Sequence, residues 1–239
     1  RYPMEWIRKE RDNYAGAGML REFMQEYMLE VDTEAAKPFS EEMLVFSDMA
    51  PAAWLPRYAI YDPSRTSRAK NAEAKRNSDR TGKVVVSRFG SRFLVHASGG
   101  HYWKPDEIKT DIFETQEHHK LAGVAVEKNS LDDWLLQPIR FEALRRGVAL
   151  NLIPLQAPQD RDKNDFILGL QAFFKAKEIV LIGGRAAHSQ LVAEILNFPV
   201  GDLDVVNALA YILKVFSGDL VYEDFGEHNI APAHEPSPG

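Results

Sequence analysis

The pattern of apolar and polar positions along the chain changes near Pro56. Before it, residues 6–29 carry apolar side chains at helical spacing around the stretch AGAG, and the segment that follows is broken by prolines. After it, RYAIYD, KVVVSRF and RFLVHAS are typical of strands, and Gly90–Ser91 between the last two predicts a hairpin turn. We therefore expect a short helical segment first and a sheet-containing domain after it.

The remainder of the chain alternates between predicted strands and predicted helices. LAGVAVE, VALNLIPL and IVLI are predicted strands, and helices are predicted over residues 105–120, 131–146, 163–177, 186–197 and 203–216. A hairpin followed by strand–helix alternation predicts a mixed α/β sheet with helices on both faces. The expected units are a helical linker subdomain over 1–55, a main domain over 56–222, and a tail over 223–239 that we expect to be disordered.

Composition narrows the classes of chemistry. A chain of 239 residues with 45% hydrophobic content can bury one sizeable core. We expect a soluble protein, because no apolar run approaches the roughly 18 residues of a membrane span and no signal peptide is visible. The chain has no cysteine, which excludes disulfides, zinc–thiolate sites and thiol nucleophiles. Because it opens on Arg1 rather than methionine, we expect it to be part of something longer.

Three acidic residues stand where acids are unexpected. Asp62 ends the apolar strand RYAIYD, Glu127 ends LAGVAVE, and Asp204 lies beside the apolar helix VVNALAYIL. A divalent cation compensates directly for the desolvation of such carboxylates, and oxygen ligands favour Mg²⁺ or Mn²⁺ over zinc. The alternative interpretation makes Asp62 a turn residue before Pro63 and Asp204 a helix cap.

One segment is strongly basic in a chain of net charge −6. Between Ser64 and Arg80, basic residues outnumber acidic ones, and the candidates for contact with a DNA backbone are Arg65, Arg68, Lys75 and Arg76. Phosphate contacts carry no sequence information, so cleavage by such a protein is expected to be nearly independent of sequence and sensitive to salt. The alternative is a solvated loop without a partner.

Several segments resemble one protein family. FPVGDLDVVNALAYIL is similar to the C-terminal motif of tailed-bacteriophage terminase large subunits, where a Phe-Pro-x-Gly stretch precedes acids and an Asp-Ala-Leu helix. YAIYDPSRTSR resembles the family's first nuclease strand, GVAVEKNS its central glutamate strand, and FMQEYMLE the segment after its ATPase domain. The resemblance covers most of the chain, and it implies a ribonuclease H-like fold.

The resemblance also assigns roles to residues. Asp62 and Glu127 match the first two metal ligands of the family, and Asp204 or Asp202 matches the third. Lys163 aligns with a lysine near the metal site and is a further candidate for DNA contact. Asn207 departs from the family, because an aspartate is usual at that position of the motif.

The implied function is endonucleolytic cutting of concatemeric double-stranded DNA during viral genome packaging, with two Mg²⁺ or Mn²⁺ ions at the phosphodiester bond. The chain has no G-x-x-x-x-G-K-S/T string, so the resemblance places the family's ATPase before Arg1. The implied partners are DNA, a portal protein and a small terminase subunit, with no membrane, in the cytoplasm of an infected host cell. Two alternatives stay open: a junction-resolvase-like nuclease on the same fold, and a non-catalytic module that docks a portal.

Overall fold

The computed structural model describes residues 37–49, 51–64, 80–128, 135–156 and 162–217, together with four isolated helical residues, Trp6, Lys9, Glu10 and Asn13. Three segments lie outside the described residues: the remainder of the predicted N-terminal helix, residues 65–79 of the basic segment, and the predicted tail. No helix in the described part of the chain is long and apolar enough to cross a membrane.

The described ranges contain a mixed sheet of seven strands in the order β1-β7-β4-β3-β2-β5-β6. β3 runs antiparallel to β2 and β4, and the other paired strands run parallel. The predicted hairpin is confirmed as β3 and β4, with Gly90 at φ 61° in its turn. The strands are β1 (Val45–Ser47), β2 (Arg57–Asp62), β3 (Thr81–Phe89), β4 (Arg92–His101), β5 (Gly123–Glu127), β6 (Leu152–Leu155) and β7 (Ile179–Ile182).

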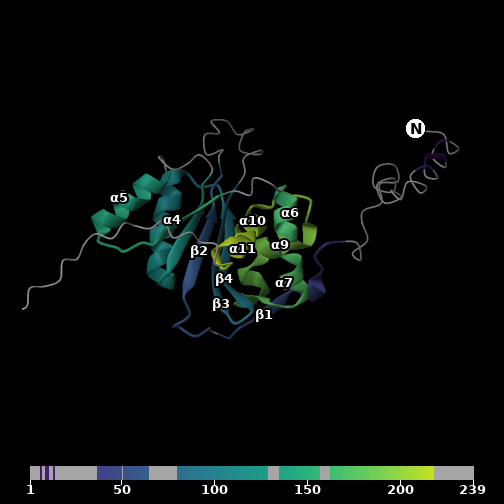
Figure 1. The fold of residues 1–239 in the computed structure, drawn as a ribbon, viewed down its shortest axis with the longest axis horizontal. Coiled ribbons are helices and arrows are strands. Elements are labelled where there is room, and N and C mark those ends of the chain that lie inside the picture. Colours follow the sequence, from purple (N-terminus) through teal and green to yellow (C-terminus); the bar gives the residue numbers. More distant parts are fainter. Residues whose placement is uncertain are drawn as a thin grey trace, which may run out of the picture.

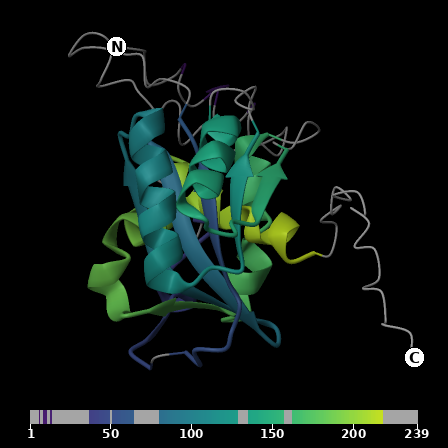
Figure 2. The ribbon, with the colours of Figure 1, turned by 90° about the vertical axis from the view of Figure 1, so that its left-hand side faces the viewer.

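Helices cover both faces of the sheet, as expected. α4 and α5 lie on one face, and α6, α7, α9, α10 and α11 lie on the other (Figures 1 and 2). Each of the last three predicted helices is in fact two shorter helices. The breaks were not predicted, because apolar residues continue at helical spacing across each of them. The helices are η2 (Glu41–Met43), α4 (Pro105–His119), α5 (Gln137–Arg146), α6 (Lys163–Leu168), α7 (Gln171–Lys175), α8 (Gly184–Ala187), α9 (Ser189–Asn197), α10 (Asp204–Ala210) and α11 (Ile212–Val215).

The apolar core forms one layer on each face of the sheet. Ile60 of β2 belongs to the layer that includes α10, whereas its neighbours Ala59 and Tyr61 belong to the layer under α4. Successive residues of a strand point to opposite faces, so Asp62 points to the same face as Ile60. Core packing therefore turns the last carboxylate of β2 toward α10.

Part of the predicted linker is built into the sheet. β1 pairs in parallel with β7, and Phe39 is buried against the rings of Phe174 and Phe198 at centroid distances of 5.4 Å and 5.5 Å. Both β1 and Phe39 precede residue 56, where the main domain was expected to begin. A strand of three residues shows too little alternation to be recognised, and its partner lies far away in the sequence.

Candidate active site

Asp62 and Glu127 end two neighbouring parallel strands. Tyr61 pairs with Val126 in the register of β2 and β5, so the two acids follow at the same level of the sheet. Both are buried, with exposed fractions of 9% and 5%. Burial raises the pKa of Asp62 well above its usual range, and the charge and hydrogen bond of Glu127 raise this pKa further. The structure thus brings together two of the three carboxylates that the sequence singled out.

Two polar side chains, one from α10 and one from the residue that follows it, contact this acid pair. Asn207 Nδ2 donates a hydrogen bond of 2.7 Å to Asp62 Oδ2. Tyr211, one turn further on, bonds to Glu127, and its pKa is raised mainly by burial and then by Glu127. Asn207, which departs from the pattern of the resembling family, thus has a defined contact with the first acid.

A glycine lets α10 begin directly against the sheet. Gly82 lies opposite Asp62 in the antiparallel register of β2 and β3. A Cβ atom at Gly82 would stand 2.0 Å from the backbone oxygen of Asp204, which is far inside van der Waals contact. The absence of a side chain at Gly82 therefore permits the close approach that places Asp204 on the Asp62 side of the sheet.

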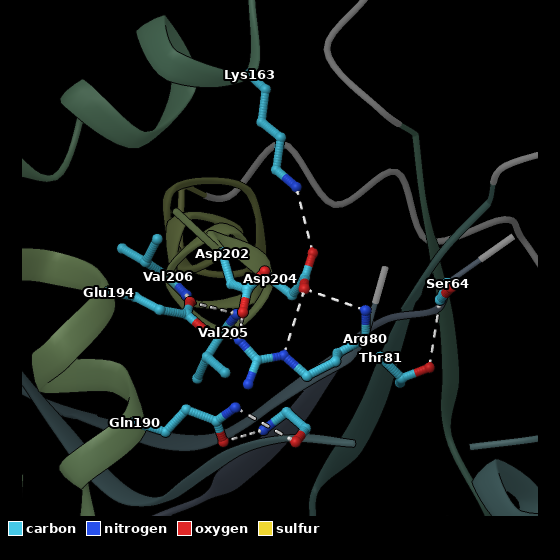
Figure 3. Close-up of polar contacts among 11 residues, drawn as sticks. Ser64, Arg80, Thr81, Lys163, Gln190, Glu194, Asp202, Asp204, Val205 and Val206 are labelled. Atoms are coloured by element: carbon cyan, nitrogen blue, oxygen red, sulfur yellow. Dashed lines mark hydrogen bonds and ion pairs between the residues drawn. The ribbon is translucent and has the colours of Figure 1, made fainter. Parts of the chain in front are cut away.

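Asp204 is buried among cationic and N–H groups (Figure 3). Its Oδ2 accepts a hydrogen bond of 3.1 Å from the backbone N–H of Arg80, and its Oδ1 lies 3.6 Å from Lys163 Nζ. The charge of Lys163 also acts on Asp62, where it opposes the rise in pKa that burial and Glu127 cause. Lys163 therefore links Asp204 electrostatically to the acid pair.

Asp202, the alternative third ligand, lies in a different environment. Its side chain is 67% exposed and accepts a hydrogen bond of 2.7 Å from the Arg80 guanidinium. The side chain of Asp204 is 9% exposed. The two aspartates thus differ in burial: Asp204 is buried and Asp202 is exposed.

The described residues on either side of the segment 65–79 lie near these acids. Asp62 ends β2 and Thr81 begins β3, and the Ser64 N–H donates to Thr81 Oγ1 at 3.3 Å between them. Arg65, Arg68, Lys75 and Arg76, the predicted DNA contacts, lie outside the described residues. Within the described ranges, no group of three His, Cys, Asp or Glu side chains has the arrangement of a metal site.

Sequence reasoning did not single out Arg80 and Glu194, which contact the start of α10. A signal for Glu194 exists in the sequence, because it shares the apolar face of α9 with Leu191 and Ile195. An acid on such a face is unexpected unless it has partners. No comparable pattern marks Arg80, which is one of several basic residues in its segment.

The strand order and the helices on both faces define a ribonuclease H-like α/β fold, which confirms the expected class. The fold is similar to the human cytomegalovirus terminase nuclease domain, with TM-score 0.52, 15% identity, and coverage of 73% of this chain and 94% of that chain. A Mn-soaked, inhibitor-bound form of that domain matches with TM-score 0.50, 12% identity, and coverage of 74% and 94%.

A third similar structure is the large terminase from a thermophilic bacteriophage in complex with ADP. It matches with TM-score 0.51 and 12% identity over 75% of this chain and 44% of that chain. No protein-family model matches the sequence, and no curated protein matches it. At these identities the likeness shows the fold, and the function is argued from the site.

Proposed function

We propose that the chain is a metal-dependent endonuclease domain of a viral DNA-packaging terminase, acting on double-stranded DNA. The observation that carries the proposal is the pair Asp62 and Glu127, buried side by side at the ends of parallel strands. Ligands of open α/β sheets bind at this end of the strands. The fold shared with terminase nuclease domains, one of them Mn-soaked, supports the same assignment.

The donor set of the pair fits a divalent cation. The charge of Glu127 raises the pKa of Asp62, because two buried carboxylates side by side repel each other. A bound Mg²⁺ or Mn²⁺, which prefers oxygen ligands, would offset that repulsion. We assign the holding of the cation to Asp62 and Glu127 and the completion of the site to Asp204. Two bound cations would supply a water of lowered pKa and neutralise charge on the leaving oxygen.

The residues around the acids have supporting roles in this proposal. Asn207 orients the Asp62 carboxylate, and Tyr211, the residue after α10, orients Glu127. The 45% exposed side chain of Lys163 is available to attract a DNA phosphate toward the acids. The basic segment 65–79 is proposed to contact the DNA backbone beside them, with a portal protein and a small terminase subunit as further partners of the complete machine.

One observation favours a second candidate function, a non-catalytic docking module. No three-acid metal arrangement occurs among the described residues, and Arg80 and Lys163 already face the carboxylate of Asp204. A module without catalysis has no reason to bind Mn²⁺. Calorimetric titration with Mn²⁺, with and without a short DNA duplex, separates the two candidates: binding supports the nuclease, and the absence of heat in both titrations supports the module.

The experiment that tests the nuclease incubates supercoiled plasmid with the protein and Mn²⁺ or Mg²⁺, with and without chelator. We expect nicking and linearisation that the chelator stops. Asp62→Asn and Glu127→Gln should each lose more activity than the roughly 10–100-fold typical of changes around a metal. Glu114→Gln, an exposed acid on α4 across the sheet, is the matched control and should cleave normally.

Stability separates loss of chemistry from loss of fold. Asp62→Asn removes a buried charge that Glu127 repels, so its free energy of unfolding should equal or exceed that of the wild type. Full cleavage by Asp62→Asn would refute the assignment. Preferential cutting of a four-way junction over linear duplex would instead indicate a resolvase-like nuclease.

A further inference from the structure

The helix that carries Asp204 has no cap of its own. The first N–H groups of an α-helix lack partners within the helix and normally bond to the side chain of a capping residue. In α10 the capping position is Leu203, which makes no side-chain hydrogen bond. The N–H groups of Val205 and Val206 lie in the first turn and are buried, so they require an acceptor from another part of the chain.

Glu194 of α9 supplies that acceptor. Its Oε2 accepts hydrogen bonds from the N–H groups of Val205 and Val206 at 2.8 Å and 2.9 Å (Figure 3). The side chain is only 4% exposed. A carboxylate at the positive end of a helix, bonded to two N–H groups, offsets part of the cost of its burial. One side chain from α9 thus closes the first turn of α10.

The second oxygen of Glu194 connects this cap to Asp204. Glu194 Oε1 lies 3.3 Å from a guanidinium nitrogen of Arg80, and the backbone N–H of Arg80 is bonded to Asp204 Oδ2. The same guanidinium nitrogen holds Asp202. Arg80 is fixed from one side by Glu194, and it fixes the Asp204 carboxylate from the other.

We propose that Glu194 is a positioning residue of the site: by capping α10 and anchoring Arg80, it holds the Asp204 carboxylate on the face of the sheet to which Asp62 points. This role rests on the proposed nuclease function. Glu194 touches neither of the paired acids in any described contact, so it acts through Asp204. A displacement of the start of α10 would move Asp204 and leave β2 and β5 in place.

The variants are Glu194→Ala, which removes both acceptor oxygens, and Glu194→Gln, which keeps one acceptor oxygen and loses the charge opposite Arg80. Gln190→Ala is the matched control on the same helix, because the Gln190 amide bonds to the backbone of Gly100 and not to α10. Thermal unfolding identifies any variant that does not fold. If Glu194→Ala does not fold, Glu194→Gln carries the test.

The first readout is amide hydrogen exchange at Val205 and Val206 in the absence of metal. Loss of a helix cap typically costs about 1 kcal/mol, so exchange at these two amides should accelerate about fivefold to tenfold in Glu194→Ala and less in Glu194→Gln. The control should exchange as the wild type does. Unchanged exchange at Val205 and Val206 would overturn the proposal.

The second readout is the Mn²⁺ concentration that gives half-maximal plasmid cleavage. It should rise by about 10–100-fold in the Glu194 variants, as for other residues that orient metal ligands, with cleavage partly restored at saturating Mn²⁺. Faster exchange with an unchanged Mn²⁺ requirement would show a merely structural cap and overturn the positioning role. If the wild type neither binds Mn²⁺ nor cleaves DNA, the proposed function fails. The exchange rates of Val205 and Val206 then still test whether Glu194 caps α10.

Discussion

Adding a single methyl group at Gly82 should displace Asp204 relative to Asp62 and Glu127. The Cβ atom of Gly82→Ala would stand 2.0 Å from the Asp204 oxygen and 2.5 Å from its carbonyl carbon. Both atoms belong to the backbone, so no side-chain rotation relieves the contact. Real Cβ atoms essentially never approach within 3.0 Å of another atom, so the start of α10 must move away by about 1 Å.

The expected consequence is a large loss of cleavage with a modest loss of stability. A misplacement of about 1 Å at a reacting centre costs about 100-fold in rate. Overpacking of this kind costs about 1–3 kcal/mol of unfolding free energy, which leaves a typical domain folded. Plasmid cleavage at saturating Mn²⁺ measures the first quantity, and urea denaturation measures the second.

Gly99→Ala is the control for Gly82→Ala. Gly99 lies on the neighbouring strand β4, opposite Lys83, and a Cβ atom there meets only the ring of His101, at 3.1 Å. This variant should cleave as the wild type does. If Gly82→Ala also cleaves at the wild-type rate while it is folded, the close approach of α10 to β3 does not set the active geometry, and the reasoning is refuted.

Three further predictions concern neighbouring groups. Asn207→Leu leaves Asp62 without its amide donor and should lower the free energy of unfolding in urea by about 1–3 kcal/mol; an unchanged value would contradict the role of this bond. Lys163→Ala should bind Mn²⁺ more tightly without DNA and bind DNA more weakly, because it removes a cation beside the acids; weaker binding of Mn²⁺ would count against that placement. Burial lowers the pKa of His96 and His119 from 6.5 to about 4. As the pH falls, the two imidazoles are therefore protonated first in the unfolded chain, and the free energy of unfolding decreases between about pH 6.5 and about pH 4. The double variant with glutamine at both positions should show a shallower loss of stability between pH 7 and pH 4.5, and parallel curves would refute this.

The strand-end acids were predictable because their signal is local. An apolar strand that ends in a carboxylate identifies both Asp62 and Glu127, and parallel pairing of β2 with β5 then brings them together. The mixed sheet followed equally from local alternation, apart from β1, whose three residues are too few to show it. These parts of the fold and site follow from the spacing of apolar and polar residues, which a short stretch of sequence shows.

The contacts of α10 were not predictable in the same way. The bond from Asn207 to Asp62 and the approach of Asp204 to Gly82 join residues that are more than a hundred positions apart. Their geometry depends on where a helix lands on a sheet, which the sequence pattern does not encode. Glu194 was predictable in part, because its position on the apolar face of a helix indicates a buried acid but not the groups that contact it.

The hydrogen bond between Ser64 and Thr81 joins a residue just after the end of β2 to the first residue of β3. Because β2 and β3 are adjacent and Ser64 is bonded to Thr81, the two points that the intervening residues must connect lie close together. Changing the length of such an insertion costs little closure entropy, since that cost grows only logarithmically. A change in the number of residues between Ser64 and Thr81 should therefore cost little stability, so the chain can lengthen or shorten at this point without altering β2 and β3.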